Sequence, residues 1–136
     1  MKNRKQIIYK TDAAVSPEDV SSVFKMSGIK RPSDDLPRLQ RMIDHADVII
    51  TAWVDDKLVG IARAITDFSY CCYLSDLAVH KEYQNMGIGR ELVRLLHEHV
   101  GEEVALLLLS SPIAMEYYPH IGFEKIENGY RIPRMR

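Results

Sequence analysis

Apolar positions along the chain follow two periods, one typical of strands and one typical of helices. Residues 48–54, 58–66 and 70–79 are rich in apolar and β-branched side chains and are bounded by turn residues, which predicts three strands. We expect Asp55-Asp56-Lys57 to form the tight turn of a hairpin between the first two of them. Residues 6–9 predict a short strand that precedes all three.

Helical periodicity predicts four helices. The first begins at Ser16-Pro17, where serine is a good N-cap and proline suits the first helical position, and it ends at Gly28. The clearest pattern covers residues 89–100, where apolar side chains recur at helical spacing. The other two helices are expected over residues 37–45 and 114–120.

The last part of the chain predicts three more strands. Val104 to Leu109 is an uninterrupted apolar run, which is typical of a strand buried on both faces. Phe123–Ile126 and Tyr130–Pro133 lie on either side of Asn128-Gly129, a strong hairpin signal, so we expect a closing hairpin. This order of elements mixes hairpins with crossovers, which predicts an α/β fold with a mixed sheet.

The composition is typical of one globular domain that covers residues 1–136. Hydrophobic residues make up 46% of the chain and charged residues 27%, which excludes a disordered protein. The net charge of −1 provides no general attraction to nucleic acid or to an anionic membrane, so we expect neither as a partner. The longest apolar run, residues 104–109, is too short to span a bilayer.

The cysteines and histidines predict neither a disulfide nor a metal site. Cys71 and Cys72 are adjacent, so on a strand they point to opposite faces and are badly placed for a mutual disulfide. No apolar export signal follows the basic first residues, and two reduced thiols then predict a cytoplasmic protein. The five histidines show no metal-ligand spacing, and His97 and His99 do not share a helix face.

A glycine-containing loop, Gln84-Asn85-Met86-Gly87-Ile88-Gly89-Arg90, precedes the clearest predicted helix. The first turn of a helix carries unpaired N–H groups and a positive dipole end, and glycine lets a phosphate approach the backbone. The loop therefore predicts a phosphorylated cofactor. Leu92 replaces the third glycine of the dinucleotide fingerprint, and Glu91 replaces the Ser/Thr that would end a P-loop, so neither nucleotide motif fits.

Two motifs resemble those of the GNAT superfamily of N-acetyltransferases. The first, Q/R-x-x-G-x-G/A, matches Gln84 to Gly89, after a Leu-Ala-Val at 77–79. The second, A-x-x-F-Y-x-x-x-G-F, is similar to residues 114–123, with Tyr117 in place of the usual Phe. The order of elements also agrees over nearly the whole chain. The resemblance implies a mixed, mostly antiparallel central sheet flanked by about four helices, with a splayed strand pair that forms a slot for CoA.

The resemblance also implies acetyl-CoA as co-substrate and assigns residues to it. Leu77, Ala78 and Val79 would pair with the pantetheine amides like an added strand, and an N–H near Leu77 or Ala78 would polarise the thioester carbonyl. The other implied contacts are the loop residues Gln84, Asn85, Met86, Gly87, Ile88, Gly89 and Arg90, and then Ser111, Ala114 and Tyr117. Arg90 and Arg94 are candidates for a phosphate contact, or alternatively for ion pairs with Glu91 and Glu98.

Two residues are candidates for acid–base chemistry. Tyr118 matches the family position that can protonate the CoA sulfur, because a phenol with a pKa of about 10 can deliver that proton. The alternative for Tyr118 is a packing aromatic. Asp76 is the carboxylate inside the strand 73–79, and it would act through a water molecule or bind the ammonium group of the acceptor. The alternative for Asp76 is a hydrogen-bonded strand residue.

The sequence therefore predicts an N-acetyltransferase that moves the acetyl group of acetyl-CoA directly to a primary amine of a small molecule or peptide. The alternative is a non-catalytic acyl-CoA-binding sensor or interaction domain. The acceptor should lie near the first two helices, the loop between them and the closing hairpin. Acidic residues such as Asp34 suit an amine there, whereas Arg131, Arg134 and Arg136 suit a carboxylate-bearing acceptor. A homodimer is consistent with the apolar edge of such a small domain.

Overall fold

The computed structural model describes residues 6–136, so the basic residues 1–5 lie outside the described part of the chain. In the described part, five strands form one sheet in the order β1-β2-β3-β4-β5. Neighbouring strands are antiparallel except β4 and β5, which are parallel. The strands are β1 (Ile8–Lys10), β2 (Val48–Val54), β3 (Lys57–Thr66), β4 (Cys71–Val79) and β5 (Ala105–Leu107). The mixed, mostly antiparallel α/β architecture expected from the sequence is confirmed.

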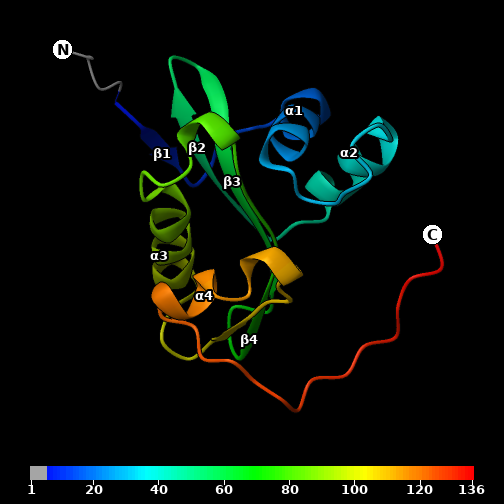
Figure 1. Cartoon of the computed structure of the whole chain (residues 1–136), viewed down its shortest axis with the longest axis vertical. Coiled ribbons are helices and arrows are strands. Elements are labelled where there is room, and N and C mark those ends of the chain that lie inside the picture. Colours follow the sequence, from blue (N-terminus) through cyan, green and yellow to red (C-terminus); the bar gives the residue numbers. More distant parts are fainter. Residues whose placement is uncertain (1–5) are drawn as a thin grey trace.

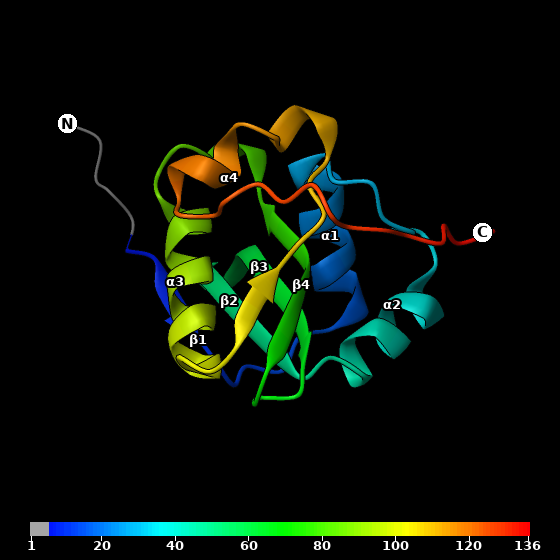
Figure 2. The same ribbon diagram turned by 90° about the horizontal axis from the view of Figure 1, so that it is seen from below.

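The helices cover the two faces of this sheet. Helix α3 (Ile88–Val100) packs on one face, and α1 (Pro17–Ser27) and α2 (Leu36–Asp44) lie on the other, as Figures 1 and 2 show. The short helix α4 (Tyr117–His120) follows β5 on the α3 side of the sheet (Figure 2). Two 3-10 turns, η1 (Lys81–Tyr83) and η2 (Pro112–Ala114), complete the order of elements.

Local sequence signals explain where the first elements begin and end. The Ser16 hydroxyl accepts the Asp19 N–H at 3.0 Å and caps α1, which ends at Gly28 with φ +82°. The β2–β3 hairpin turns through Asp55 and Asp56, which have φ of 48° and 64°. Positive φ at both central residues is the backbone of a tight hairpin turn, and aspartate tolerates it better than most side chains.

The core has one apolar cluster on each face of the sheet. On the α3 face, Leu92 and Leu96 pack with residues from β2, β3 and β4. On the α1 face, Phe24 and Leu39 pack with Ile61 of β3. Burying side chains of this size stabilises the fold by roughly 1.5–3 kcal/mol each. The central strands are therefore fixed between two packed layers, which gives the site on β4 a rigid base.

A bulge in β4 changes which side chains face which helix layer. Arg63 pairs with Asp76 and Ala64 pairs with Leu74, so Ser75 is an extra residue in β4. One extra residue in a strand reverses the face of the sheet to which the side chains on the far side of the bulge point. Leu74 belongs to the cluster on the α3 face, whereas Ala78 belongs to the cluster on the α1 face. The bulge therefore directs the Asp76 side chain toward the α1 side.

Two expectations for the last strands are wrong. The run 104–109 is not a strand buried on both faces, because β5 is short and lies at the sheet edge, with Leu107 44% exposed. One face of the run packs on the α3 cluster through Leu106 and Leu108. The apolar run therefore reflects an edge covered on one side, since continuous hydrophobicity does not tell a central strand from an edge strand.

The closing hairpin is also absent from the described residues, in which no strand follows β5. Residues 124–136 are all exposed, and Tyr130 and Ile132 contact no core. A hairpin without a face to bury is marginal in water, so the Asn128-Gly129 signal alone did not produce one. The segment instead runs from α4 to the α1–α2 side, where Arg38 Nη2 donates to the Arg136 carbonyl oxygen at 3.3 Å (Figure 2).

Candidate functional site

The edge of β4 opens toward β5 after three ladder positions. Cys71, Cys72 and Tyr73 pair with residues 105–107, and β5 then ends while β4 continues to Val79. Cys71 is exposed and Cys72 is buried, and both are free, as their alternation on a strand predicts. The remaining half of β4 has no ladder partner on the β5 side within the described residues. The expected splay between the two strands is therefore present.

Hydrogen bonds at the end of β4 show which main-chain groups face this opening. The His80 N–H donates to the Val59 carbonyl of β3 at 2.8 Å, so His80 and, by alternation, Ala78 face β3. The Val79 carbonyl points the other way and accepts Gln84 Nε2 at 2.9 Å. Leu77 and Val79 therefore present their main-chain groups to the opening.

The glycine loop lies directly at the end of this opening. Asn85 and Gly87 have positive φ, 66° and 81°, and Gly87 is the N-cap of α3. Only glycine adopts this conformation without strain from a Cβ, and no atom lies within 4 Å of where a Cβ at Gly87 would be. Ile88 is 1% exposed and anchors the loop in the core. The loop thus presents the first N–H groups of a long helix at a fixed position.

The Tyr117 side chain packs against the first turn of α3. A Cβ on Gly89 would lie 2.4 Å from the Tyr117 hydroxyl oxygen, so a larger residue at this position would displace the Tyr117 side chain. Partial burial raises the pKa of the Tyr117 phenol, and the charge of Arg90 opposes that rise. Tyr117 therefore stays a neutral hydrogen-bond donor beside the helix N-terminus.

Tyr118 occupies a more enclosed place than Tyr117. Its ring makes edge contacts with the rings of Tyr117 and Phe123, with centroid distances of 5.4 and 5.6 Å. Burial raises the pKa of Tyr118, the Tyr117 phenol adds to the rise, and the Arg31 guanidinium opposes it. A phenol with a raised pKa keeps its proton at neutral pH, which is the state that a general acid needs.

The other predicted cofactor contacts are distributed around the loop. Arg90 Nη2 donates to the His120 carbonyl at 2.8 Å and so links α3 to α4. Arg94 forms ion pairs with Glu91 at 2.5 Å and Glu98 at 2.9 Å, which confirms the ion-pair interpretation for this residue. Ser111 is the N-cap of η2, and Ala114 is the last residue of this turn. Met86 is exposed in the glycine loop.

Asp76 is enclosed by two arginines that the sequence pattern did not point to. Its carboxylate is fully buried, and its oxygens accept from Arg31 Nε and Arg63 Nε respectively. Arg63 is its cross-strand neighbour on β3, and Arg31 comes from the loop between α1 and α2. This geometry favours the hydrogen-bonded strand residue over a base. An arginine inside the apolar strand 57–66 is the one signal in the sequence that could have identified Arg63.

Two further polar features lie away from the opening. His80 is buried and its Nδ1 accepts the Glu82 N–H at 3.1 Å, so it caps η1. Burial lowers the pKa of His80, and the charge of Lys57 lowers it further.

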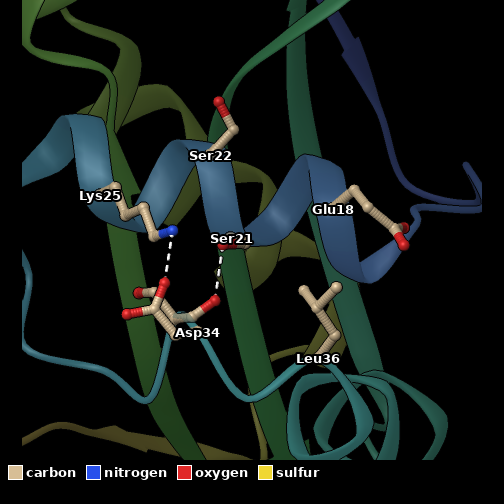
Figure 3. A pocket seen from close by; sticks show the side chains of 7 residues that line it. Glu18, Ser21, Ser22, Lys25, Asp34 and Leu36 are labelled. Atoms are coloured by element: carbon tan, nitrogen blue, oxygen red, sulfur yellow. Dashed lines mark hydrogen bonds and ion pairs between the residues drawn. The ribbon is translucent and has the colours of Figure 1, made fainter.

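A hollow of about 410 Å³ lies between α1 and residues 33–36 (Figure 3). It is lined by α1 and by that loop and does not reach the glycine loop. Among residues 6–136, no group of three histidine, cysteine or acidic side chains has metal-binding geometry.

Sequence comparison shows the family. The model of the acetyltransferase (GNAT) family matches residues 18–123, so the chain belongs to this family. An uncharacterized N-acetyltransferase, ycf52, of Pyropia yezoensis is 26% identical over 109 residues, which are 76% of this chain and 61% of that protein. GCN5-related N-acetyltransferase 2, chloroplastic, of Arabidopsis thaliana is 30% identical over 82 residues, 57% of this chain and 31% of that protein. The chain therefore spans less than two thirds of the length of these relatives.

Solved structures show the same fold. A probable acetyltransferase of unknown function from methicillin-resistant Staphylococcus aureus superposes with a TM-score of 0.79 at 21% identity, over 95% of this chain and all of that one. Aminoglycoside N-acetyltransferase AAC(6')-Iy in complex with CoA superposes with a TM-score of 0.73 at 16% identity, over 100% of this chain and 99% of that one. No helix in residues 6–136 has the length and hydropathy that crossing a membrane requires.

Proposed function

We propose that this member of the acetyltransferase family transfers the acetyl group of acetyl-CoA to the primary amine of a small molecule or peptide. The observation that carries the proposal is the arrangement of three features around one opening. These are the half of β4 without a strand partner, the glycine loop at the N-terminus of α3, and the half-buried phenol of Tyr118, whose ring contacts Tyr117 beside that loop. The solved structure of AAC(6')-Iy contains CoA and has the same fold, which supports this choice of co-substrate.

The loop and strand fit the two polar parts of acetyl-CoA. The N–H groups from Asn85 to Arg90 and the positive end of α3 suit the diphosphate. The main-chain groups of Leu77 and Val79 suit the pantetheine amides, because they face the opening and have no strand partner there. Gln84 acts through its bond to the Val79 carbonyl, which fixes the loop to the end of β4.

Acetyl transfer needs an oxyanion donor and a proton for the departing thiolate. The Leu77 N–H is the donor that the strand alternation directs into the opening, and a donor of this kind contributes about 3–4 kcal/mol of transition-state stabilisation in other enzymes. The neutral amine attacks the thioester carbonyl, the carbon–sulfur bond breaks, and Tyr118 gives its proton to the sulfur. The amine loses its extra proton to solvent, and the phenol regains a proton from solvent.

Asp76 then has a positioning role. Both of its oxygens already accept guanidinium N–H groups and the side chain is closed to solvent, so it does not reach a substrate amine. It fixes Arg31 beside the opening instead.

A panel assay tests the proposed activity. Purified protein, acetyl-CoA and a set of amines, diamines, amino acids and peptides should give CoA thiol together with an equal amount of acetylated amine, identified by mass spectrometry. Binding of acetyl-CoA with no transfer to any amine would instead support the sensor domain. A cytoplasmic location stays a prediction, because relatives such as the Arabidopsis protein are named as chloroplastic.

A further inference from the structure

A cluster of three charges lies on the acceptor side of β4. Asp76 is held between Arg31 and Arg63, and the two guanidinium groups and one carboxylate leave a net charge of +1. The side chain of Asp76 is fully buried and that of Arg63 is 8% exposed, whereas the side chain of Arg31 is 27% exposed. A ligand can therefore contact the excess positive charge at the guanidinium of Arg31. Charge in a poorly solvated place is costly without a counter-charge, so an anion is favoured there.

Arg31 has donors left for such an anion. Its Nε donates to Asp76, its Nη1 to the Lys30 carbonyl at 2.6 Å and its Nη2 to the Ser75 carbonyl at 2.7 Å. These three bonds use three of the five N–H groups of a guanidinium, counted over residues 6–136. Arg31 is thus oriented by the protein and still able to bind a carboxylate, which guanidinium groups recognise in a plane.

The position of Arg31 relative to the reaction follows from its contacts. Ser75 and Asp76 immediately precede Leu77, whose N–H faces the proposed acetyl position. The charge of Arg31 also opposes the rise in the pKa of Tyr118, so the guanidinium that is bonded to Ser75 and Asp76 lies near the proposed acid as well. A group bound to Arg31 would therefore lie next to the attacking amine.

The loop that carries Arg31 is held firmly on α1. The Ser21 hydroxyl donates to the Ser33 carbonyl at 2.6 Å, and Lys25 pairs with Asp34 at 2.6 Å (Figure 3). The Ser33 N–H donates to the Arg31 carbonyl at 2.7 Å. Both anchors lie at the hollow described above, so the hollow belongs to the support of the loop. Anchoring the loop in this way reduces the entropy that Arg31 would lose on binding a ligand.

We propose that the acceptor is an amine that carries a carboxylate close to the reacting nitrogen, as an amino acid does, and that Arg31 binds this carboxylate. The proposal rests on the acetyltransferase function proposed above and specifies its substrate class. It also predicts that amines without an anion are poor acceptors, because the cluster repels an added positive charge. Polyamines and aminoglycosides fall in that group.

Matched pairs of acceptors test the proposal. The rate of acetylation is measured for L-phenylalanine against 2-phenylethylamine and for L-lysine against 1,5-diaminopentane, each pair differing by one carboxylate. We expect kcat/KM to be about 10- to 100-fold higher for the carboxylate-bearing member, the range that one charged hydrogen-bonded contact supports. Equal rates, or faster transfer to the decarboxylated member, would overturn the proposal while leaving the acetyltransferase function intact. Transfer to neither class would overturn both.

Variants assign the preference to Arg31. Arg31→Gln should reduce the ratio within each pair to near 1, mainly through a higher KM for the amino acid, with acetyl-CoA affinity unchanged. Arg31→Lys, which keeps the charge and loses the planar fork, should keep part of the preference. Arg41→Gln removes the same charge from an exposed position on α2 and should leave the ratio unaltered. A preference that survives in Arg31→Gln would contradict the assignment, and the wild-type ratios decide the substrate class even if this variant is unstable.

Discussion

Tyr117 and Tyr118 are neighbours in the sequence, yet the structure gives them different surroundings. The Tyr117 hydroxyl lies against Gly89 in the first turn of α3, where a cofactor phosphate would bind. Tyr118 packs on Phe123 and lies within the field of Arg31. The two phenols therefore suit different tasks, one in cofactor binding and one in proton transfer.

Removing the Tyr118 hydroxyl should slow transfer without preventing cofactor binding. Tyr118→Phe is expected to lower kcat by roughly 10²- to 10⁴-fold, the range for loss of a general acid, because the thiolate then leaves without its proton. Calorimetry should find acetyl-CoA affinity within about twofold of wild type. Tyr130→Phe is the matched control, since Tyr130 is fully exposed on the terminal segment. Unchanged kcat in Tyr118→Phe would remove Tyr118 from the mechanism.

The pH dependence of the rate should reflect the raised pKa of Tyr118. Burial and Tyr117 raise this pKa above its ordinary value near 10, so the phenol stays protonated as the pH rises through the neutral and mildly alkaline range. We expect kcat of the wild-type protein to show no fall up to about pH 10. Loss of rate at lower alkaline pH, absent from Tyr118→Phe, would show that the phenol ionises too early for this role.

A double-mutant cycle can measure the contact between Gly89 and Tyr117. Gly89→Ala should lower the free energy of unfolding by about 1 kcal/mol or more, because the new methyl group meets the Tyr117 hydroxyl at 2.4 Å. In Tyr117→Phe the nearest remaining ring atom is 3.4 Å away, so the same change should be neutral or stabilising, as alanine favours helix over glycine. Equal costs in both backgrounds, measured by urea unfolding, would exclude the contact.

At the scale of elements, the bulge at Ser75 and the short β5 together make the site. The bulge directs Asp76 to the α1 side, where it holds Arg31, and the early end of β5 leaves Leu77 and Val79 without a strand partner on that edge. The loop after β4 then fixes the start of α3. In the proposed function, the cofactor would lie along this edge of β4, and the acceptor would lie on the side of α1.

Two glycines with the same backbone conformation allow a controlled test of the loop. Gly87 has φ +81° and Gly28 has φ +82°, and at both positions the space that a Cβ would occupy has no atom within 4 Å. Alanine at either position should lower the free energy of unfolding by about 1 kcal/mol through backbone strain. Only Gly87→Ala should also weaken acetyl-CoA binding, by about tenfold, because it disturbs a phosphate donor. Equal affinities of the two variants for acetyl-CoA would exclude the loop from the binding site.

Local signals were enough to predict most of the elements and the loop. The cap at Ser16, the glycines at 87 and 89 and the pair Tyr117-Tyr118 each act within a few residues, so the sequence shows them directly. The partners of Asp76 could not be predicted this way, because Arg31 lies 45 residues earlier and meets it only in the folded chain. The prediction of a closing hairpin was wrong for a related reason, because a turn signal does not show whether the strands have a buried face to pack against.

At the scale of the whole molecule, the chain divides into a packed sheet-and-helix body and an exposed end. Residues 124–136 bury no side chain, and the contact between Arg38 and the Arg136 carbonyl links this end to α2. The body holds every residue assigned to the cofactor. The end runs to α2, on the side proposed for the acceptor, so its arginines stay candidates for substrate contacts.

Removing the exposed end should therefore cost little stability. A protein that stops after Phe123 should unfold within about 0.5 kcal/mol of the full chain and bind acetyl-CoA with similar affinity, because no buried surface is lost. Phe123→Ala is the contrasting variant, since Phe123 packs on Tyr118 and on the α3 cluster, and it should cost about 1–3 kcal/mol. A large loss of stability on truncation would show that the end packs on the body in solution.

The central claim is direct acetyl transfer from acetyl-CoA to an amine, and the most direct measurement is a mass-balanced turnover. Wild-type protein is mixed with acetyl-CoA, with and without an amino acid acceptor, and thiol release, acetylated product and protein mass are followed together. The account predicts thiol release only with the acceptor, one acetylated amine per thiol, and no change in protein mass. Thiol release that does not depend on the acceptor, or an acetyl group left on the protein, would contradict it.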